Sequence, residues 1–259
     1  MSSVFAAEIP TLRLLYKLKK LDPSPSPFKG ATAAYNNQIA TIRGDITKLA
    51  VDAIVNAANR SLLGGGGVDG AIHRAAGPGL LAECHTLGGC ATGNSKITNA
   101  YELNCRKVIH TVGPVYNENY AERCAAALKG CYWSALNLAV QNGLKTIAFS
   151  AISTGVYGYP SGQAAYIACA TVKEFLETEH GRKLDKIIFV TFEEKDVQAY
   201  NRLLPRFFPP EAEADTKSND TQSLNNREAI VDELPSVPNT DPADSGHVQK
   251  KQKQDGNTS

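Results

Sequence analysis

A run of four glycines is the feature of the sequence that points most directly to chemistry. Residues 64–67 are all glycine, and Val68, Asp69 and His73 follow them. Each glycine loses more backbone entropy on folding than any other residue, so the run predicts backbone conformations or close approaches that a β-carbon would block. If a helix begins directly after the run, its free N–H groups and positive dipole end form a binding site for phosphate. A flexible turn is the alternative, although ordinary turns seldom need four glycines.

A second loop, residues 150–160, repeats this pattern. Its sequence, SAISTGVYGYP, follows an apolar run and combines small hydroxyl side chains with two glycines. The backbone N–H groups of such a loop can surround a diphosphate. Tyr157 and Tyr159 would then offer flat surfaces for a sugar or a base. The alternative is a tight turn with a tyrosine packed beneath it.

The elements that must position these loops are predicted from hydrophobic periodicity. Between residues 36 and 204, short β-branched runs alternate with longer helical periods, which is typical of an α/β layered fold. The runs IVNAA, TIAFSAI and KIIFVTF are apolar on both faces, so they predict central strands covered by helices on both sides. We therefore expect a three-layer α/β/α sandwich around a central mixed sheet. The predicted strands are 38–43, 53–56, 95–101, 107–112, 146–151 and 186–192, and the predicted helices are 68–76, 79–87, 120–142, 162–180 and 194–207, with Gly143 and Gly181 as C-terminal caps.

Ligands of such sheets bind beyond the carboxyl ends of the strands, so the loops after Asn56, Ala151 and Phe192 are the candidate sites. Three familiar motifs do not explain them. Residues 65–70 satisfy GxGxxG, but no acidic residue ends a second strand about 20 residues later, as a dinucleotide fold requires. Residues 88–95 fit a Walker A frame except that Asn94 replaces the phosphate-binding lysine, and no GxSxG elbow occurs.

The amino-acid sequences of the two loops, and their order in the chain, closely resemble those of the macrodomain family, and within it the MacroD-type ADP-ribosyl hydrolases. The resemblance covers roughly residues 36–207. It depends on GDIT at 44–47, VNAAN at 55–59, GGGGVDGAIHRAAGP at 64–78, VIHTVGP at 108–114 and ISTGVYGYP at 152–160.

The resemblance implies where ADP-ribose would bind. In the family, the aspartate matching Asp45 accepts a hydrogen bond from the adenine amino group, and the backbone at Ile46 contacts the ring. Phe192 resembles the aromatic that stacks on adenine, an interaction of about 1–3 kcal/mol. Without the resemblance, Gly-Asp would be an ordinary turn and the aromatic a core residue. The remaining implied contacts to the diphosphate and distal ribose are Asn59, Gly66, Gly67, Val68, Ser153, Thr154, Gly155, Val156 and Tyr157.

The resemblance also implies three catalytic residues. Asp69 would position or activate a water near the anomeric carbon of the distal ribose, and Asn59 would hydrogen-bond a ribose hydroxyl. His73 lies one helical turn after Asp69 and would hold its carboxylate. We expect the helix dipole to keep Asp69 ionised, as a good water orienter but a weak base that the substrate's diphosphate assists. Alternatively, Asp69 is only an N-cap and His73 only packs, while His110 is expected in the core.

The function that this resemblance implies is hydrolysis. The enzyme would remove mono-ADP-ribose that is ester-linked to Asp or Glu of proteins and would deacetylate O-acetyl-ADP-ribose. We expect no metal and no redox cofactor, and a monomer whose partners are ADP-ribose and ADP-ribosylated proteins. The alternative is a reader module that binds ADP-ribose without chemistry, whereas a dinucleotide oxidoreductase fails on the missing ribose-binding acid.

The charge distribution divides the 259 residues into unlike parts. The chain carries 27 Lys and Arg against 26 Asp and Glu, which gives no basic field for bulk nucleic-acid binding. Residues 211–259 have a net charge of −5 and contain no aromatic residue, so they are predicted to be a disordered acidic tail. Residues 31–210 are expected to form the macrodomain, and residues 1–30 are expected to be an N-terminal extension outside it. No apolar run approaches the roughly 18 residues that span a membrane.

The cysteines and the N-terminal segment bear on the cellular compartment. Residues 11–21 form a basic amphipathic segment, predicted to be a packed helix, with a flexible arm or a mitochondrial presequence as alternatives. Residues 250–253 are a basic cluster, interpreted as a weak signal for the nucleus or for an acidic surface. We therefore expect an intracellular protein, cytoplasmic or nuclear, with the mitochondrial alternative left open. Cys84, His85 and Cys90 are close in sequence, but buried thiols are favoured over a metal site. The six cysteines contain no CxxC pair and fit a reducing compartment: Cys84, Cys90, Cys105, Cys124, Cys131 and Cys169.

Overall fold

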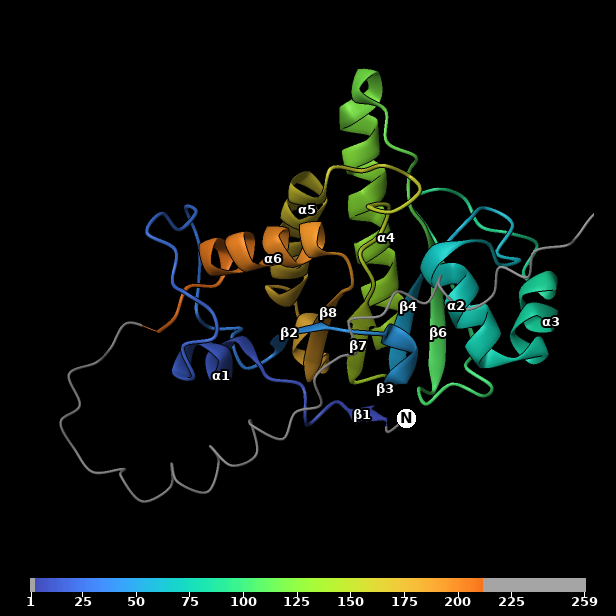
Figure 1. Cartoon of the computed structure of the whole chain (residues 1–259), viewed down its shortest axis with the longest axis horizontal. Coiled ribbons are helices and arrows are strands. Elements are labelled where there is room, and N and C mark those ends of the chain that lie inside the picture. The colour runs from blue at the N-terminus through green and yellow to red at the C-terminus, as the bar shows by residue number, and fades with distance from the viewer. Residues whose placement is uncertain (1–2, 212–259) are drawn as a thin grey trace, which may run out of the picture. The chain divides into compact units, whose positions relative to one another are not determined.

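The computed structural model describes residues 3–211 of the chain. The predicted acidic tail lies outside the described residues, apart from Glu211, and so does the basic cluster at 250–253. Figure 1 shows the order of the strands across the domain.

The central sheet has six strands in the order β2-β8-β7-β4-β6-β5. All neighbours pair in parallel except β5 with β6, which pair antiparallel, so the predicted mixed sheet is confirmed. All six strands begin within one residue of their predicted starts, whereas β4 ends two residues later than predicted and β5 and β7 end two residues earlier. The bounds are β2 Ile39–Arg43, β4 Ala53–Ala58, β5 Ser95–Asn99, β6 Lys107–Val112, β7 Thr146–Phe149 and β8 Lys186–Thr191.

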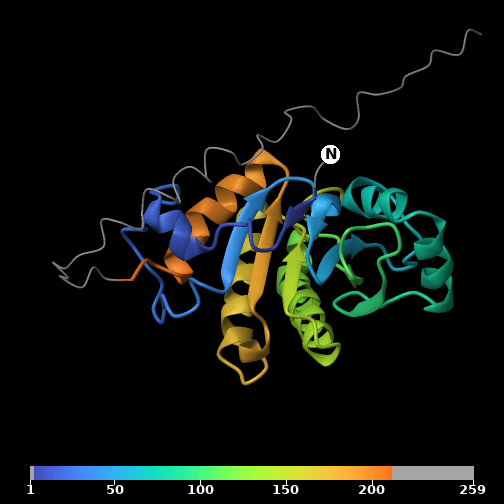
Figure 2. The same ribbon diagram turned by 90° about the horizontal axis from the view of Figure 1, so that it is seen from below.

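Helices cover both faces of this sheet, which makes the predicted three-layer sandwich. One face packs against α4 (Ala121–Gln141), α5 (Ser161–Leu176) and α6 (Glu194–Phe207). The other packs against α2 (Gly67–Ala76) and α3 (Pro78–Thr86). Figure 2 shows α4 in lime and α5 in gold lying side by side. Successive side chains of β4 point alternately to the two faces of the sheet, so adjacent residues belong to opposite cores.

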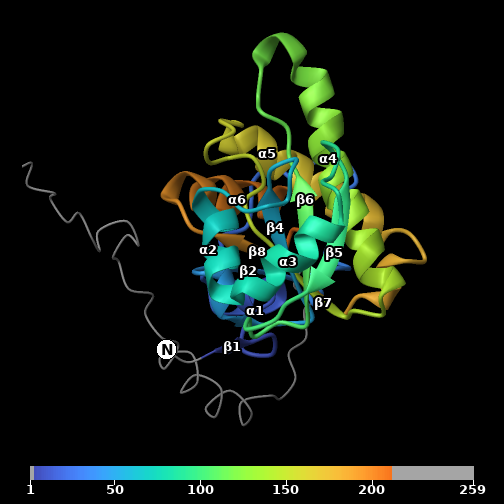
Figure 3. The same ribbon diagram turned by 90° about the vertical axis from the view of Figure 1, so that its right-hand side faces the viewer.

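Three short 3₁₀ turns connect the larger elements of the domain. The 3₁₀ turns are η1 (Ile46–Lys48), η2 (Glu118–Tyr120) and η3 (Gly181–Lys183). The end of α4 that follows η2 extends past the neighbouring helices (Figure 3). No helix of the described residues is both long and apolar enough to cross a membrane. All six cysteines are free thiols.

Of the two glycines predicted as C-terminal helix caps, one is confirmed and the other is not. Gly143 follows α4 with a φ of +66°, which confirms it as a left-handed C-terminal residue. The prediction for Gly181 is wrong, because α5 already ends at Leu176 and Gly181 begins η3. Glycine is needed there for close approach, since a β-carbon would clash with the backbone of Leu176.

The N-terminal residues pack against the domain. Strand β1 (Val4–Phe5) pairs in parallel with β3 (Leu49–Ala50), and the partly buried ammonium of Lys186 donates to the carbonyl groups of Ala6 and Ile9 in the same N-terminal segment. The predicted amphipathic helix is α1 (Leu12–Lys17), whose first residue, Leu12, is fully buried in the core. The packed helix is therefore the correct structural interpretation, and the flexible arm is wrong.

This packing predicts an asymmetric response to truncation of two leucines in α1. Leu12→Ala is expected to lower the free energy of unfolding by about 2–5 kcal/mol, because it leaves a cavity in the core. Leu14→Ala is the matched control, since Leu14 is 38% exposed and its truncation should cost at most about 0.5 kcal/mol. Urea denaturation of the two variants checks this. Equal, small effects would mean that α1 does not contribute to the core.

Candidate functional site

Four loops meet at one edge of the sheet. Strands β2, β8, β7 and β4 are consecutive neighbours and parallel, so their carboxyl ends lie in that order. Asp45 and Ile46 follow β2, Phe192 follows β8, and the two glycine-rich loops follow β7 and β4. Three inter-strand spacings, about 14 Å, separate the first of these positions from the last. The strand order thus brings together the residues that the sequence placed far apart.

The glycine run adopts conformations that explain its composition. Gly64 and Gly67 have φ values of +82° and +60°, which other residues rarely adopt. Gly65 is required for close approach, because a β-carbon there would lie 3.2 Å from both Asn59 Nδ2 and Asp69 Oδ2. The predicted need for bare backbone is therefore confirmed at three of the four glycines, while Gly66 has open space around it.

The glycine run ends as an uncapped helix N-terminus. Gly66 is the N-cap of α2, and no side chain accepts a hydrogen bond from the first N–H groups, which include that of Val68. These donors and the helix dipole face the loop with no protein acceptor of their own. The arrangement can bind an anion, as the sequence predicted.

Asp69 is a buried carboxylate held by one strong hydrogen bond. It is 3% exposed, and its Oδ1 accepts from Asn56 Nδ2 at 2.7 Å. The N-cap alternative is wrong, because the cap is Gly66 and Asp69 lies inside the first turn of α2. Since Asn56 occupies Oδ1, the other oxygen remains directed at the backbone of Gly65.

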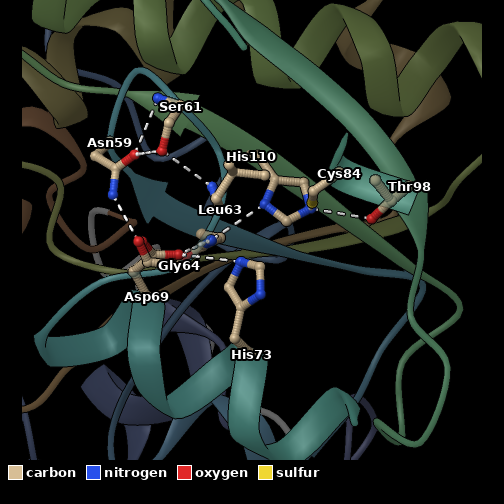
Figure 4. A network of polar contacts seen from close by, with 10 residues as sticks. Asn59, Ser61, Leu63, Gly64, Asp69, His73, Cys84, Thr98 and His110 are labelled. Carbon is tan, nitrogen blue, oxygen red and sulfur yellow. Dashed lines mark hydrogen bonds and ion pairs between the residues drawn. The ribbon is translucent and has the colours of Figure 1, made fainter. Parts of the chain in front are cut away.

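Asn56 belongs to a chain of buried hydrogen bonds that continues away from Asp69. Its Nδ2 also lies 3.1 Å from His110 Nδ1, and His110 Nε2 lies 3.0 Å from Thr98 Oγ1 (Figure 4 shows His110 with Thr98). Because an amide nitrogen only donates, His110 Nδ1 accepts and its Nε2 carries the proton. Burial, assisted by nearby His73, lowers the pKa of His110 to about 3, so the ring is neutral. His110 is a core residue, as expected.

Sequence reasoning missed the role of Asn56. It was noted only as the start of a loop, yet it is fully buried and supports the carboxylate. The signal was present, since Asn56 interrupts an otherwise apolar strand that both faces of the sheet bury. A buried polar side chain in such a strand must have hydrogen-bond partners.

The direction of the pKa shift of Asp69 differs from the one that its place in the helix predicted. The helix dipole was expected to keep it a weak base, but burial raises its pKa above the ordinary value, and the Asn56 hydrogen bond and His73 offset only part of this. Desolvation of the charged form therefore outweighs the favourable position in the helix. A carboxylate with a raised pKa accepts a proton more readily than a solvated one.

His73 and Asn59 flank the carboxylate on different sides. His73 Nε2 lies 3.5 Å from Asp69 Oδ1, one turn along α2, as the sequence predicted. Asn59 donates to the carbonyl of Gly64 at 2.7 Å and accepts from both the N–H and the hydroxyl of Ser61. Figure 4 shows these three hydrogen bonds of Asn59. Asn59 therefore shapes the glycine loop, and only the second N–H of its amide is left for a ligand.

The second loop, residues 150–160, is held in place by hydrogen bonds to side chains of α6. Thr154 Oγ1 donates to buried Asp196 at 3.0 Å, and Lys195 donates to the carbonyl of Thr154 at 2.9 Å. Ser153 is 6% exposed and has a φ of +68°, a strained conformation for a residue with a side chain. The tip of the loop points outward, since Val156 is 90% exposed.

The aromatic residues of this region divide into two groups. Tyr159 is 3% exposed and packs against Tyr116 with tilted rings whose centroids lie 4.7 Å apart, so it cannot offer a surface to a ligand. That expectation is wrong, and Tyr159 is the tyrosine packed beneath the turn. Tyr157 is half-buried and Phe192 is 52% exposed, which leaves both rings accessible.

Asp45 and Ile46 lie at the first strand end. Asp45 Oδ1 accepts from the N–H and the hydroxyl of Thr47 at 2.9 and 2.8 Å, so it caps η1. No described residue donates to its second oxygen, and the residue is exposed. Ile46 is buried at 4%.

Comparison with known proteins places this site in a family. The profile of the family described as Macro domain matches residues 55–168. The ADP-ribose glycohydrolase MACROD2 of Xenopus laevis is 51% identical over 78% of this chain and 48% of its own length. The Macro domain-containing protein CT2219 of Chlorobaculum tepidum is 56% identical over 65% of this chain and 96% of its own. The chain thus spans about half the length of the first of these relatives.

A solved structure gives the same result. The crystal structure of a Trypanosoma brucei macrodomain in complex with ADP-ribose is 44% identical to this chain and superimposes with a TM-score of 0.66. The match covers 79% of this chain and 78% of the other.

Asp69 in the site and Asp52 before the amino end of β4 have pKa values shifted in opposite directions, and these shifts predict opposite effects of removing the charge. Because the folded Asp69 has a raised pKa, the unfolded chain loses this proton first, and the free energy of unfolding falls as pH rises from 3.8 through the raised pKa. Asp69→Asn keeps an acceptor for Asn56 and removes this loss. The variant is expected to be more stable than the wild type at neutral pH and equally stable near pH 3 in urea denaturation.

Asp52→Asn is the control with the opposite sign. Burial raises the pKa of Asp52, but the hydrogen bonds of Lys145, Arg106 and Thr146 outweigh it and hold the pKa below 3.8. Its stabilisation is present above that value and is lost as the pH falls, so Asp52→Asn should lose stability at neutral pH. If Asp69→Asn, like Asp52→Asn, is less stable than the wild type at neutral pH, burial is not the dominant effect on the pKa of Asp69.

Proposed function

The chain belongs to the Macro domain family, and on that premise we propose that it is a hydrolase that releases ADP-ribose from ester-linked Asp and Glu side chains of proteins. The observation that carries the proposal is the buried Asp69, held by Asn56 and facing the bare backbone of Gly65. The relatives named as ADP-ribose glycohydrolases support it.

The binding mode follows the order of the strand ends. Adenine would lie between Asp45, the backbone of Ile46 and the exposed ring of Phe192. The diphosphate would lie in the middle, against the N–H groups of both glycine-rich loops. The contacts proposed there are Gly66, Gly67, Val68, Ser153, Thr154, Gly155, Val156 and Tyr157.

The distal ribose would then reach the β4 end of the site. The free N–H of Asn59 would donate to a ribose hydroxyl, and the ring would lie outside the bare backbone of Gly65, on the side of Asp69 Oδ2. This role for Asn59 is compatible with its contacts to the loop, because its amide nitrogen carries two protons.

The reaction uses one ordered water. Asp69 Oδ2 orients the water, whose oxygen bonds to the anomeric carbon while the bond from that carbon to the acyl oxygen breaks. The electron pair leaves with the carboxylate of the modified side chain, and the water proton passes to Asp69. The raised pKa of Asp69 makes it a better acceptor for this proton, and general-base help of this kind contributes about 10²- to 10⁴-fold.

His73 would act through Asp69. At 3.5 Å from Oδ1, it limits the rotation of the carboxylate without contacting the substrate. O-acetyl-ADP-ribose carries an ester on the same ribose, so we propose it as a second substrate. The free thiols favour a reducing, intracellular compartment, and we propose a monomer that acts on modified proteins there.

Substitution of Asp69 tests the proposal. Asp69→Ala is expected to lower the turnover of a protein carrying ester-linked mono-ADP-ribose by at least about 10²-fold, because the water loses its acceptor. Binding of free ADP-ribose, measured by calorimetry, should change little. Glu122→Ala removes a carboxylate from the first turn of α4 instead and should have no effect on turnover.

The chemical linkage between ADP-ribose and the protein distinguishes the proposed mechanism from its alternatives. Substrates with Ser- or Arg-linked ADP-ribose should be hydrolysed far more slowly, since their leaving groups are poorer than a carboxylate. Binding of ADP-ribose with no turnover of any substrate would identify a reader module. Equal rates on all linkages, or full activity of Asp69→Ala, would contradict the mechanism.

A further inference from the structure

Behind Asp69, three side chains from different elements bring soft metal ligands together. His73 from α2, Cys84 from α3 and His110 from β6 each offer one ligand atom, and these atoms all lie within 4.8 Å of one another. The sequence analysis considered Cys84 only with His85 and Cys90. The fold gives it different neighbours, which can be seen in Figure 4.

The contacts inside this group are close and buried. Cys84 Sγ lies 3.7 Å from His110 Nε2, and both residues are fully buried. Zinc bound by sulfur at about 2.3 Å and by imidazole at about 2.0 Å holds such ligand atoms roughly 3.3–3.8 Å apart. One pair already satisfies this spacing, and His73 needs to move by about 1 Å.

Two buried polar atoms beside the group have no hydrogen-bond partner among the described residues. One is His73 Nε2, and the other is Asn56 Oδ1. A buried atom of this kind is costly unless some state of the protein uses it. The first belongs to a histidine of the group and lies 3.5 Å from Asp69 Oδ1, and the second adjoins another member, since the same amide lies 3.1 Å from His110 Nδ1.

We propose that His73, Cys84 and His110 form a binding site for a soft divalent cation of the zinc class, and that an ion bound there inhibits the hydrolase. One thiolate and two imidazoles are a donor set that favours zinc over magnesium or calcium. Asp69 is adjacent to His73, so the thiolate and this carboxylate together balance the two positive charges of the ion. The inhibitory part rests on the proposed function, whereas the binding part does not.

Binding changes the hydrogen bonds around Asn56. The Cys84 thiol gives up its proton to solvent as the Sγ–metal bond forms. His110 binds the ion through Nε2 and therefore carries its proton on Nδ1. A metal-bound histidine usually donates that proton to an oxygen. Asn56 supplies the oxygen by turning its amide over, which uses the previously unpartnered Oδ1.

That turn explains the inhibition. When the Asn56 amide turns, the hydrogen bond of 2.7 Å from Nδ2 to Asp69 is lost, and oxygen faces oxygen instead. His73, drawn toward the ion, also leaves its place beside the carboxylate. The ion can enter from the surface through His73, which lines a pocket of about 380 Å³ together with Leu63, Arg74 and Leu81.

Cobalt is the probe for binding, because a thiolate bound to Co²⁺ gives a charge-transfer absorption band in the near ultraviolet. Titration of the full chain with Co²⁺ should give this band with one equivalent, and Zn²⁺ should displace it. The band should be absent in Cys84→Ser and in Cys84→Ala. Cys90→Ser is the matched control and should keep it, since Cys90 lies outside the group. Thermal unfolding confirms that each variant is folded.

The activity readout follows from the same samples. Zn²⁺ should reduce turnover by at least about tenfold, a chelator should restore it, and Cys84→Ser should resist Zn²⁺ relative to its own metal-free rate. Absence of the band, or a band that persists in both Cys84 variants, would overturn the site. Binding with unchanged turnover would overturn only the inhibition, and a chain inactive without metal would contradict the proposed function while the cobalt result still stands.

Discussion

The hydrogen bond from Asn56 to Asp69 is the interaction on which the rest of the site depends. It joins a central strand to the first turn of a helix in the covering layer, and it fixes one carboxylate oxygen at 2.7 Å. Because Asn56 uses both N–H groups, on Asp69 and on neutral His110, its amide cannot rotate without breaking the network. The carboxylate is therefore oriented before any ligand binds, and its burial, rather than its position in the helix, determines its pKa.

The glycine loop is built around this fixed carboxylate. A β-carbon on Gly70 would clash with the carbonyl oxygen of Gly65, so the loop can lie directly on α2 only because Gly70 lacks a side chain. The loop after β7 is held independently, through Thr154 and the buried Asp196 at the start of α6. Two supports on different helices thus bring bare backbone to one edge of a parallel sheet, where such folds bind ligands.

The sequence predicted the three layers, the strands and the two glycine-rich loops, because hydrophobic periodicity and glycine are local signals. It failed where the outcome depends on which side chains meet. Nothing local places Cys84 against His110, or Asn56 under Asp69, since these pairs come from different elements. Tyr159 was misjudged because a tyrosine after glycine can face either way until Tyr116 packs on it. Gly181 was misjudged because close approach and left-handed φ demand the same residue.

The pH dependence of single-turnover hydrolysis tests the central claim most directly, measured in the wild type and in Asn56→Ala on an ester-linked ADP-ribosylated protein. In the wild type, the rate should fall in acid with a midpoint above 3.8, the ordinary pKa of aspartate. In Asn56→Ala, the midpoint should rise further and the plateau should fall, because the ionised carboxylate loses its donor and its orientation. The same midpoint in both proteins would contradict the account.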